Sequence, residues 1–134
     1  LVDFGRRICG VAQPTIKRWI SILQVSFIAY LLKPFHANLG KRLIKTPKFY
    51  FIDSAIAAYL TRQGNQDSLF NSAMRGAFFE GFIVIETFKA FLNKGLNADL
   101  FYWRSHDGLE IDLIISFNEK LYPVEIKKNT DSKY

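Results

Sequence analysis

Gly108-Leu109-Glu110-Ile111-Asp112-Leu113-Ile114-Ile115 is followed, after a short polar link, by Tyr122-Pro123-Val124-Glu125-Ile126-Lys127. Both runs are rich in apolar and β-branched residues set between polar ones, which predicts two strands. The link contains Asn118-Glu119, and so short a connection predicts a tight hairpin turn. These two strands and their turn fix how the second half of the chain is expected to fold.

The register of this hairpin places charged side chains on one face. If Asn118 and Glu119 form the loop, Asp112 lies opposite Glu125, and Lys127 shares the face of Glu125. Carboxylates that face each other are unfavourable unless a cation lies between them, and Mg²⁺ prefers carboxylate oxygens. The hairpin therefore predicts either a metal-binding face or a charged surface with a Glu110–Lys127 ion pair of little energetic weight.

Composition sets wide limits. The 134 residues carry a formal net charge of +6 and are 49% hydrophobic and 16% aromatic, which is enough for a core. A basic chain fits contact with nucleic acid without requiring it. The single cysteine excludes an internal disulfide and a cysteine-based zinc site. No apolar run reaches membrane-spanning length, so we expect no membrane partner and a cytoplasmic location.

The first half of the chain has the pattern of a helix followed by a β-hairpin. Pro14 suits the first position of a helix, and apolar residues recur along one face. An extended run over residues 25–32 and a strand over residues 48–52 follow, and Asp53 or Ser54 can cap a short helix that ends at Leu60. The apolar face consists of Ile16, Trp19, Ile20 and Leu23.

Cations cluster in two places in this half, which has the layout of a winged helix. Lys17 and Arg18 lie on the polar face of the helix, where a recognition helix carries its DNA contacts. The expected hairpin tip carries Lys41, Arg42, Lys45 and Lys48, which could follow phosphates. The alternatives are an ordinary amphipathic helix and a solvated turn.

The longest helix is expected over residues 75–93, with Gly95 as its stop signal. Its residues are apolar almost all round, which predicts a buried helix in which Glu80 and Glu86 need partners. Either glutamate could complete a metal site, or form a salt bridge to Arg75, Lys89 or Arg104. A strand over residues 99–104 and a turn at Asp107-Gly108 follow, and Arg104 is a candidate phosphate contact.

Taken together, these landmarks resemble the C-terminal region of a family of prokaryotic AAA-type ATPases, a domain of unknown function in the PD-(D/E)XK nuclease-like clan. The clan's motif reads here as Asp112 followed by Glu125-Ile126-Lys127, with Glu80 on the preceding helix. The other matching stretches are Pro14-Thr15-Ile16-Lys17-Arg18-Trp19, Gly40 to Lys48, Phe51-Ile52-Asp53, Arg75 to Glu80, Tyr102-Trp103-Arg104 and Glu110-Ile111-Asp112. Asp53-Ser54-Ala55-Ile56 departs from the family's usual Asp-Thr-Gly-Leu.

The resemblance implies an α+β fold. It divides the chain into a winged-helix-like segment at residues 1–62, a linker at 63–74 and a truncated PD-(D/E)XK-like α/β core at 75–134, made of a helix and then three strands. Asp112, Glu125 and Glu80 would hold Mg²⁺, and Lys127 would stabilise charge on a phosphate or help to activate water.

The implied partners are DNA and the N-terminal ATPase module of the parent protein, which this chain lacks. No G-X4-G-K-(S/T) phosphate loop occurs in the sequence, so ATP binding by that route is not expected. The expected function is that of a nuclease-like, DNA-interacting domain, with Mg²⁺-dependent phosphodiester hydrolysis as its activity. The alternative is a non-catalytic module of the ATPase that binds DNA or a protein and regulates it.

Overall fold

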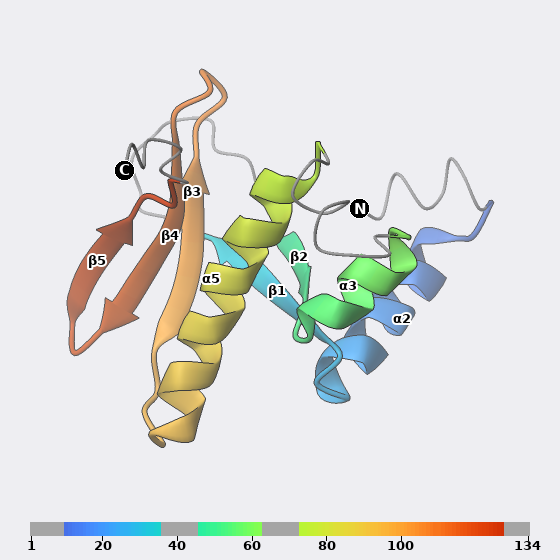
Figure 1. The fold of residues 1–134 in the computed structure, drawn as a ribbon, viewed down its shortest axis with the longest axis horizontal. Helices are drawn as coiled ribbons and strands as arrows, with labels where there is room; N and C mark the ends of the chain where they lie inside the picture. The colour runs from blue at the N-terminus through green and yellow to red at the C-terminus, as the bar shows by residue number, and fades with distance from the viewer. Residues whose placement is uncertain (1–9, 36–45, 63–72, 128–134) are drawn as a thin grey trace, which may run out of the picture.

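A computed structural model describes residues 10–35, 46–62 and 73–127 (Figure 1). It confirms the α+β class. The elements, in chain order, are α2 (Gln13–Val25), β1 (Ala29–Pro34), β2 (Lys48–Phe51), α3 (Ser54–Leu60), α5 (Arg75–Asn93), β3 (Asp99–Arg104), β4 (Glu110–Phe117) and β5 (Lys120–Val124). Of these helices, none is long and apolar enough to cross a membrane, a finding that covers the described residues alone.

The described strands form one sheet in the order β2-β1-β3-β4-β5. β1 pairs antiparallel with β2 and parallel with β3, and β3, β4 and β5 form an antiparallel meander. The β1–β2 hairpin of the first half therefore continues the sheet of the second half. The limits expected at residues 1–62, 63–74 and 75–134 stay a prediction, and residues 63–72 lie outside the described part.

The β4–β5 hairpin has the register that the sequence predicts. Phe117 pairs with Lys120, and the ladder runs without a shift to Leu113 and Val124. Asn118 and Glu119 both have positive φ, 50° and 60°, as a two-residue type I′ loop requires. The expectation that the second strand reaches Lys127 is wrong, since β5 ends at Val124. Two residues beyond Val124, the Ile126 N–H donates to a side chain, the Asp112 carboxylate.

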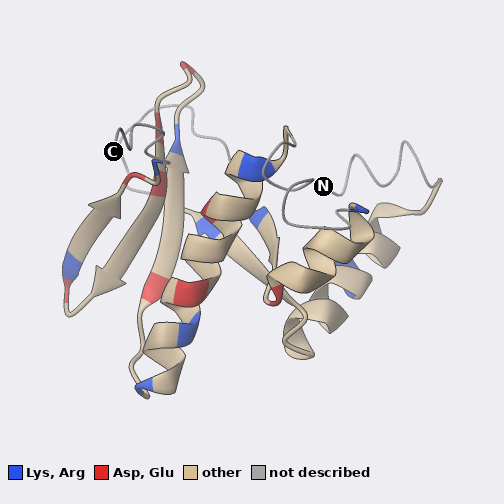
Figure 2. Ribbon diagram, in the orientation of Figure 1, with Lys and Arg blue, Asp and Glu red and all other residues tan. Residues whose placement is uncertain are grey.

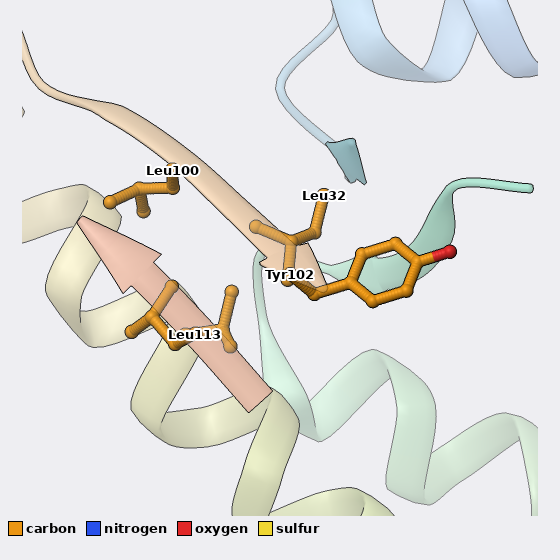
Figure 3. Close-up of a cluster of buried hydrophobic side chains, with 5 residues drawn as sticks. Leu32, Leu100, Tyr102 and Leu113 are labelled. Atoms are coloured by element: carbon orange, nitrogen blue, oxygen red, sulfur yellow. The ribbon is translucent and has the colours of Figure 1, made fainter. Parts of the chain in front are cut away.

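Helix α5 crosses one face of the sheet (Figure 1). Its bounds are those predicted, and Gly95 after it has a φ of +63°. Its Val84 packs into a core with Leu32, Leu100, Tyr102 and Leu113, which come from three different strands (Figure 3). The expectation of a helix buried all round is wrong, because the sheet covers one side of α5. Phe82 and Leu92, on its other sides, are 49% and 48% exposed.

Helix α2 differs from its predicted extent at the C-terminal end. It continues to Val25, and residues 26–28 turn the chain before β1 begins at Ala29. Of the expected apolar face, Ile16 is buried, whereas Trp19 is 54% exposed. The short helix α3 is capped as predicted, because the Asp53 carboxylate accepts a hydrogen bond from the Ala55 N–H at 2.8 Å.

Candidate functional site

The candidate site begins where strand β2 faces helix α5. Lys48 and Tyr50 are two residues apart on β2, so their side chains leave the same face of the strand. Both reach one oxygen of Glu80 on α5. The Lys48 Nζ lies 2.7 Å from Glu80 Oε1, and the Tyr50 hydroxyl donates to the same oxygen at 2.5 Å. This carboxylate is thus held by a cation and a neutral donor together.

The same lysine also reaches the start of β4. Lys48 Nζ lies 2.6 Å from Glu110 Oε1, and Arg104 Nε at the end of β3 lies 3.6 Å from Glu110 Oε2. We refer to Lys48, Tyr50, Glu80, Arg104 and Glu110 as the Lys48 network. The Lys48, Glu80 and Glu110 side chains are 22%, 26% and 27% exposed, so water screens these ion pairs only in part. Figure 2 shows acidic and basic segments interspersed along α5 rather than separated by sign.

Tyr102 on β3 lies beneath this network. The Lys48 Nζ is 5.0 Å from the centroid of the Tyr102 ring, within the range of a cation–π contact. The Tyr102 hydroxyl points away from the core leucines (Figure 3) and donates to the Thr46 carbonyl oxygen at 2.5 Å. The Phe35 N–H donates to the Tyr102 carbonyl oxygen at 2.7 Å. Tyr102 therefore contacts the chain on both sides of residues 36–45.

The pKa values in the network favour one protonation state. Burial alone would lower the pKa of the Lys48 ammonium, but its hydrogen bonds to Glu110 and Glu80 outweigh burial and raise it. Burial, followed by the hydrogen bond to Glu80 and the negative charges nearby, raises the pKa of the Tyr50 hydroxyl. At neutral pH Lys48 is therefore a cation. The Tyr50 hydroxyl stays protonated and acts as a hydrogen-bond donor.

The residues of the expected Asp and Glu-X-Lys motif lie at the open end of the β4–β5 hairpin. Asp112 Oδ2 accepts a hydrogen bond from the Ile126 N–H at 2.8 Å. Lys127 Nζ lies 3.0 Å from Glu125 Oε1, and these two side chains are 75% and 64% exposed. The expectation of an ion pair between Glu110 and Lys127 is wrong, because Glu110 pairs with Lys48 and Lys127 pairs with Glu125. Asp112 thus contacts the backbone of the motif rather than its charged side chains.

Whether Asp112, Glu125 and Glu80 could hold Mg²⁺ depends on the groups that each of them already contacts. Within residues 10–35, 46–62 and 73–127, no group of three or more His, Cys, Asp or Glu is close enough to hold a metal ion. Glu80 is bound by Lys48 and Tyr50, whereas Glu125 is solvent-facing and paired with Lys127. The set Asp112, Glu125 and Glu80 therefore does not fit a shared ion in this arrangement. Asp112 and Glu125 remain candidates as a pair, because Mg²⁺ sites often combine one or two carboxylates with water.

The expected nucleic-acid contacts fall into three groups. Lys17 and Arg18 are exposed on α2, as expected of residues that meet a ligand. Arg104 is 47% exposed but lies near Glu110, and Lys48 is held between two carboxylates. Lys41, Arg42 and Lys45 lie outside the described residues.

Sequence reasoning missed Tyr50 and the part that Glu110 plays. A signal for both was present, since Lys48 and Tyr50 form a polar pair on one face of an otherwise aromatic strand. On the inward face of a strand the lysine ammonium requires a negative partner, and the tyrosine hydroxyl requires a hydrogen-bond partner. Glu86 has one of the partners expected for it, because Lys89 Nζ lies 2.9 Å from its Oε1.

Comparison with known proteins assigns each half of the chain to a family model. Residues 6–67 match a domain of unknown function (DUF8612), and residues 75–134 match another domain of unknown function (DUF4143). The two parts of the chain are thus similar to two different domains of unknown function. It is 32% identical over 124 residues to uncharacterized proteins of Mycobacterium tuberculosis and Mycobacterium bovis. The alignments cover 92% of this chain and 27% of each relative, so the chain spans about a quarter of their length. No solved structure matches the chain significantly.

Proposed function

We propose that this chain is a DNA-contacting, non-catalytic module of an AAA-type ATPase. The observation that carries the proposal is the orientation of α2. Ile16 is buried against the rest of the fold, while its neighbours Lys17 and Arg18 are exposed. A helix anchored by its apolar face and carrying cations on its outer face has the form of a helix that docks on a phosphate backbone.

Further features of α2 support this docking surface. Its first turn contains no acidic residue, so the positive end of the helix dipole is not offset there. Arg18 lines a shallow hollow with Trp19, a residue that is 54% exposed. An exposed aromatic ring beside a guanidinium suits contact with sugars and bases as well as with phosphates. The net charge of +6 adds long-range attraction to a polyanion.

In this proposal the acidic residues of the second half stabilise the fold and take no part in catalysis. Glu80 and Glu110 are compensated by Lys48, and Glu125 by Lys127. The resemblance to the C-terminal region of AAA-type ATPases supports the choice of parent protein. The relatives, of which this chain covers 27%, are long enough to include an ATPase module.

Mg²⁺-dependent phosphodiester hydrolysis is the second candidate function. The contact between Asp112 and the Ile126 N–H favours it, because it brings an acidic side chain beside the Glu125-Ile126-Lys127 run as the PD-(D/E)XK resemblance implies. Both candidate functions predict that the chain contacts DNA. Only the hydrolytic function predicts that the DNA strand is cleaved.

DNA binding can be measured by fluorescence anisotropy with a labelled duplex, from about 50 mM to about 200 mM salt. Replacing both cations of α2 (Lys17→Gln with Arg18→Gln) removes two phosphate contacts. The slope of log K against log salt should therefore become shallower by about 2 units, at about 0.9 per contact. Lys94→Gln with Lys120→Gln is the matched control, because it removes the same charge from exposed positions away from α2. If the α2 variant keeps the parent slope, α2 is not the contact surface.

A further inference from the structure

Lys48 connects parts of the sheet that are not neighbours. β1 and β3 both lie between β2 and β4 in the sheet order. The Lys48 side chain nevertheless contacts Glu110 at the start of β4, passing near the ring of Tyr102 on β3. It also contacts Glu80 on the helix that covers this face. One ammonium group therefore joins β2, β4 and α5.

The charges of Lys48 and its neighbours balance. Glu80 and Glu110 bring two negative charges to one partly buried place, and two carboxylates there would repel each other without a cation. Lys48 lies 2.7 Å and 2.6 Å from them, both hydrogen-bonding distances. Arg104 Nε lies 3.6 Å from the other carboxylate oxygen of Glu110, Oε2, and adds a second positive charge.

We propose that Lys48 is the resident cation of the Glu80–Glu110 pair and closes it to divalent metal. The ammonium of Lys48 lies between the carboxylates, where a metal ion would have to lie to neutralise both. This metal-excluding contact goes beyond the DNA-contacting function and holds whether or not α2 binds DNA.

Two further contacts support this position of the ammonium. Tyr50 donates its hydroxyl proton to Glu80 Oε1, so the carboxylate stays oriented toward β2. The Tyr102 ring gives the ammonium an aromatic face at 5.0 Å. The hydrogen bonds to Glu110 and Glu80 raise the pKa of Lys48, so the cation persists through the physiological pH range.

Thermal unfolding of the whole chain, in a chelator and in millimolar Mg²⁺, tests this inference. The parent should have the same Tm in both conditions, because Lys48 already neutralises the acidic pair. Lys48→Met should lower the Tm by about 5 °C or more in the chelator, and Mg²⁺ should restore a large part of that loss reversibly. Lys89→Met is the matched control, because Lys89 forms an exposed ion pair with Glu86, one turn earlier on α5. This variant should show neither the loss of Tm nor the response to Mg²⁺.

A triple variant keeps the inference testable if Lys48→Met does not fold. Lys48→Met combined with Glu80→Gln and Glu110→Gln has no uncompensated carboxylate, so it should fold in the chelator and show no response to Mg²⁺. Three results would overturn the inference: a parent that Mg²⁺ stabilises as much as Lys48→Met, a folded Lys48→Met that Mg²⁺ does not stabilise, or a triple variant as unstable as the single one. DNA binding is not used as a readout, so failure here is distinct from failure of the proposed function.

Discussion

The Asp112 carboxylate on β4 and the Ile126 N–H just beyond β5 form a hydrogen bond of 2.8 Å. The bond replaces the strand ladder, which ends at Val124 opposite Leu113. It keeps the Glu125-Ile126-Lys127 run beside β4 although that run is not part of a strand. A side-chain acceptor therefore positions the backbone of the motif that the sequence singles out.

Removing this acceptor should destabilise the end of the hairpin. Asp112→Ala should lower the free energy of unfolding by about 1 kcal/mol, because the partly buried Ile126 N–H loses its partner. Asp112→Asn keeps an acceptor oxygen and should stay within about 0.5 kcal/mol of the parent. Urea unfolding of the two variants compares them directly. Equal losses in both would mean that charge, and not the hydrogen bond, matters at this position.

Gly81 gives a second test, because its position on α5 faces Tyr50. A Cβ added at Gly81 would lie 3.0 Å from Tyr50 Cδ1, so the ring would have to give by a few tenths of an ångström, and its hydrogen bond to Glu80 opposes that movement. Gly81→Ala should therefore destabilise the fold by about 1–3 kcal/mol. Gly76→Ala, in the same helix and with nothing within 4 Å, should stabilise it by up to about 1 kcal/mol through helix propensity. A stabilised Gly81→Ala would show that the Tyr50 ring is not fixed there.

Stability should fall at alkaline pH. Burial, with a contribution from the charge of Asp99, raises the pKa of Tyr30 to about 12, and burial raises the pKa of Tyr50 as well. In the unfolded chain both hydroxyls lose their protons near pH 10. From about pH 10 to 12 the folded chain binds more protons than the unfolded chain, so the free energy of unfolding decreases as the pH rises.

Urea unfolding at a series of alkaline pH values, with tyrosinate absorbance as a second readout, checks this dependence. Tyr50→Phe should show a shallower decrease than the parent, because one of the raised groups is gone. A parent whose stability does not change through this range would contradict the assignment of Tyr30 and Tyr50 as buried, protonated groups.

The β4–β5 loop offers a stabilising substitution. Glu119 has a φ of 60°, a left-handed conformation that costs a non-glycine residue about 1 kcal/mol. Glu119→Gly should recover up to that amount, because Asn-Gly is the preferred pair for a type I′ loop. Lys120→Gly, one residue later and within β5, is the matched control and should destabilise the hairpin. Denaturant midpoints that move in the same direction for both would argue against this loop geometry.

The features predicted correctly from the sequence are those with local causes. Helix α5 has the predicted bounds because its apolar run and Gly95 mark its extent. The β4–β5 register follows from a two-residue loop and from the alternation of side chains between the two faces of a strand. The end of β5 was not predictable in this way, because it depends on the Asp112 side chain competing for the Ile126 N–H.

The Lys48 network lay beyond sequence reasoning because its members are distant in the chain. Lys48 and Glu80 are 32 positions apart, and their contact depends on how α5 lies across the sheet. Exposure of Phe82 was missed for a related reason. Periodicity indicates that a helix is apolar all round, but it cannot tell how many of its faces the fold covers.

A single gel tests the central claim, that this chain contacts DNA without cutting it. Supercoiled plasmid is incubated with the chain in millimolar Mg²⁺ and run both before and after the protein is removed. The account predicts retarded plasmid before removal, less retardation for Lys17→Gln with Arg18→Gln, and fully supercoiled plasmid afterwards. Plasmid that is not retarded would contradict DNA contact, and Mg²⁺-dependent nicking that Asp112→Asn abolishes would contradict the non-catalytic assignment.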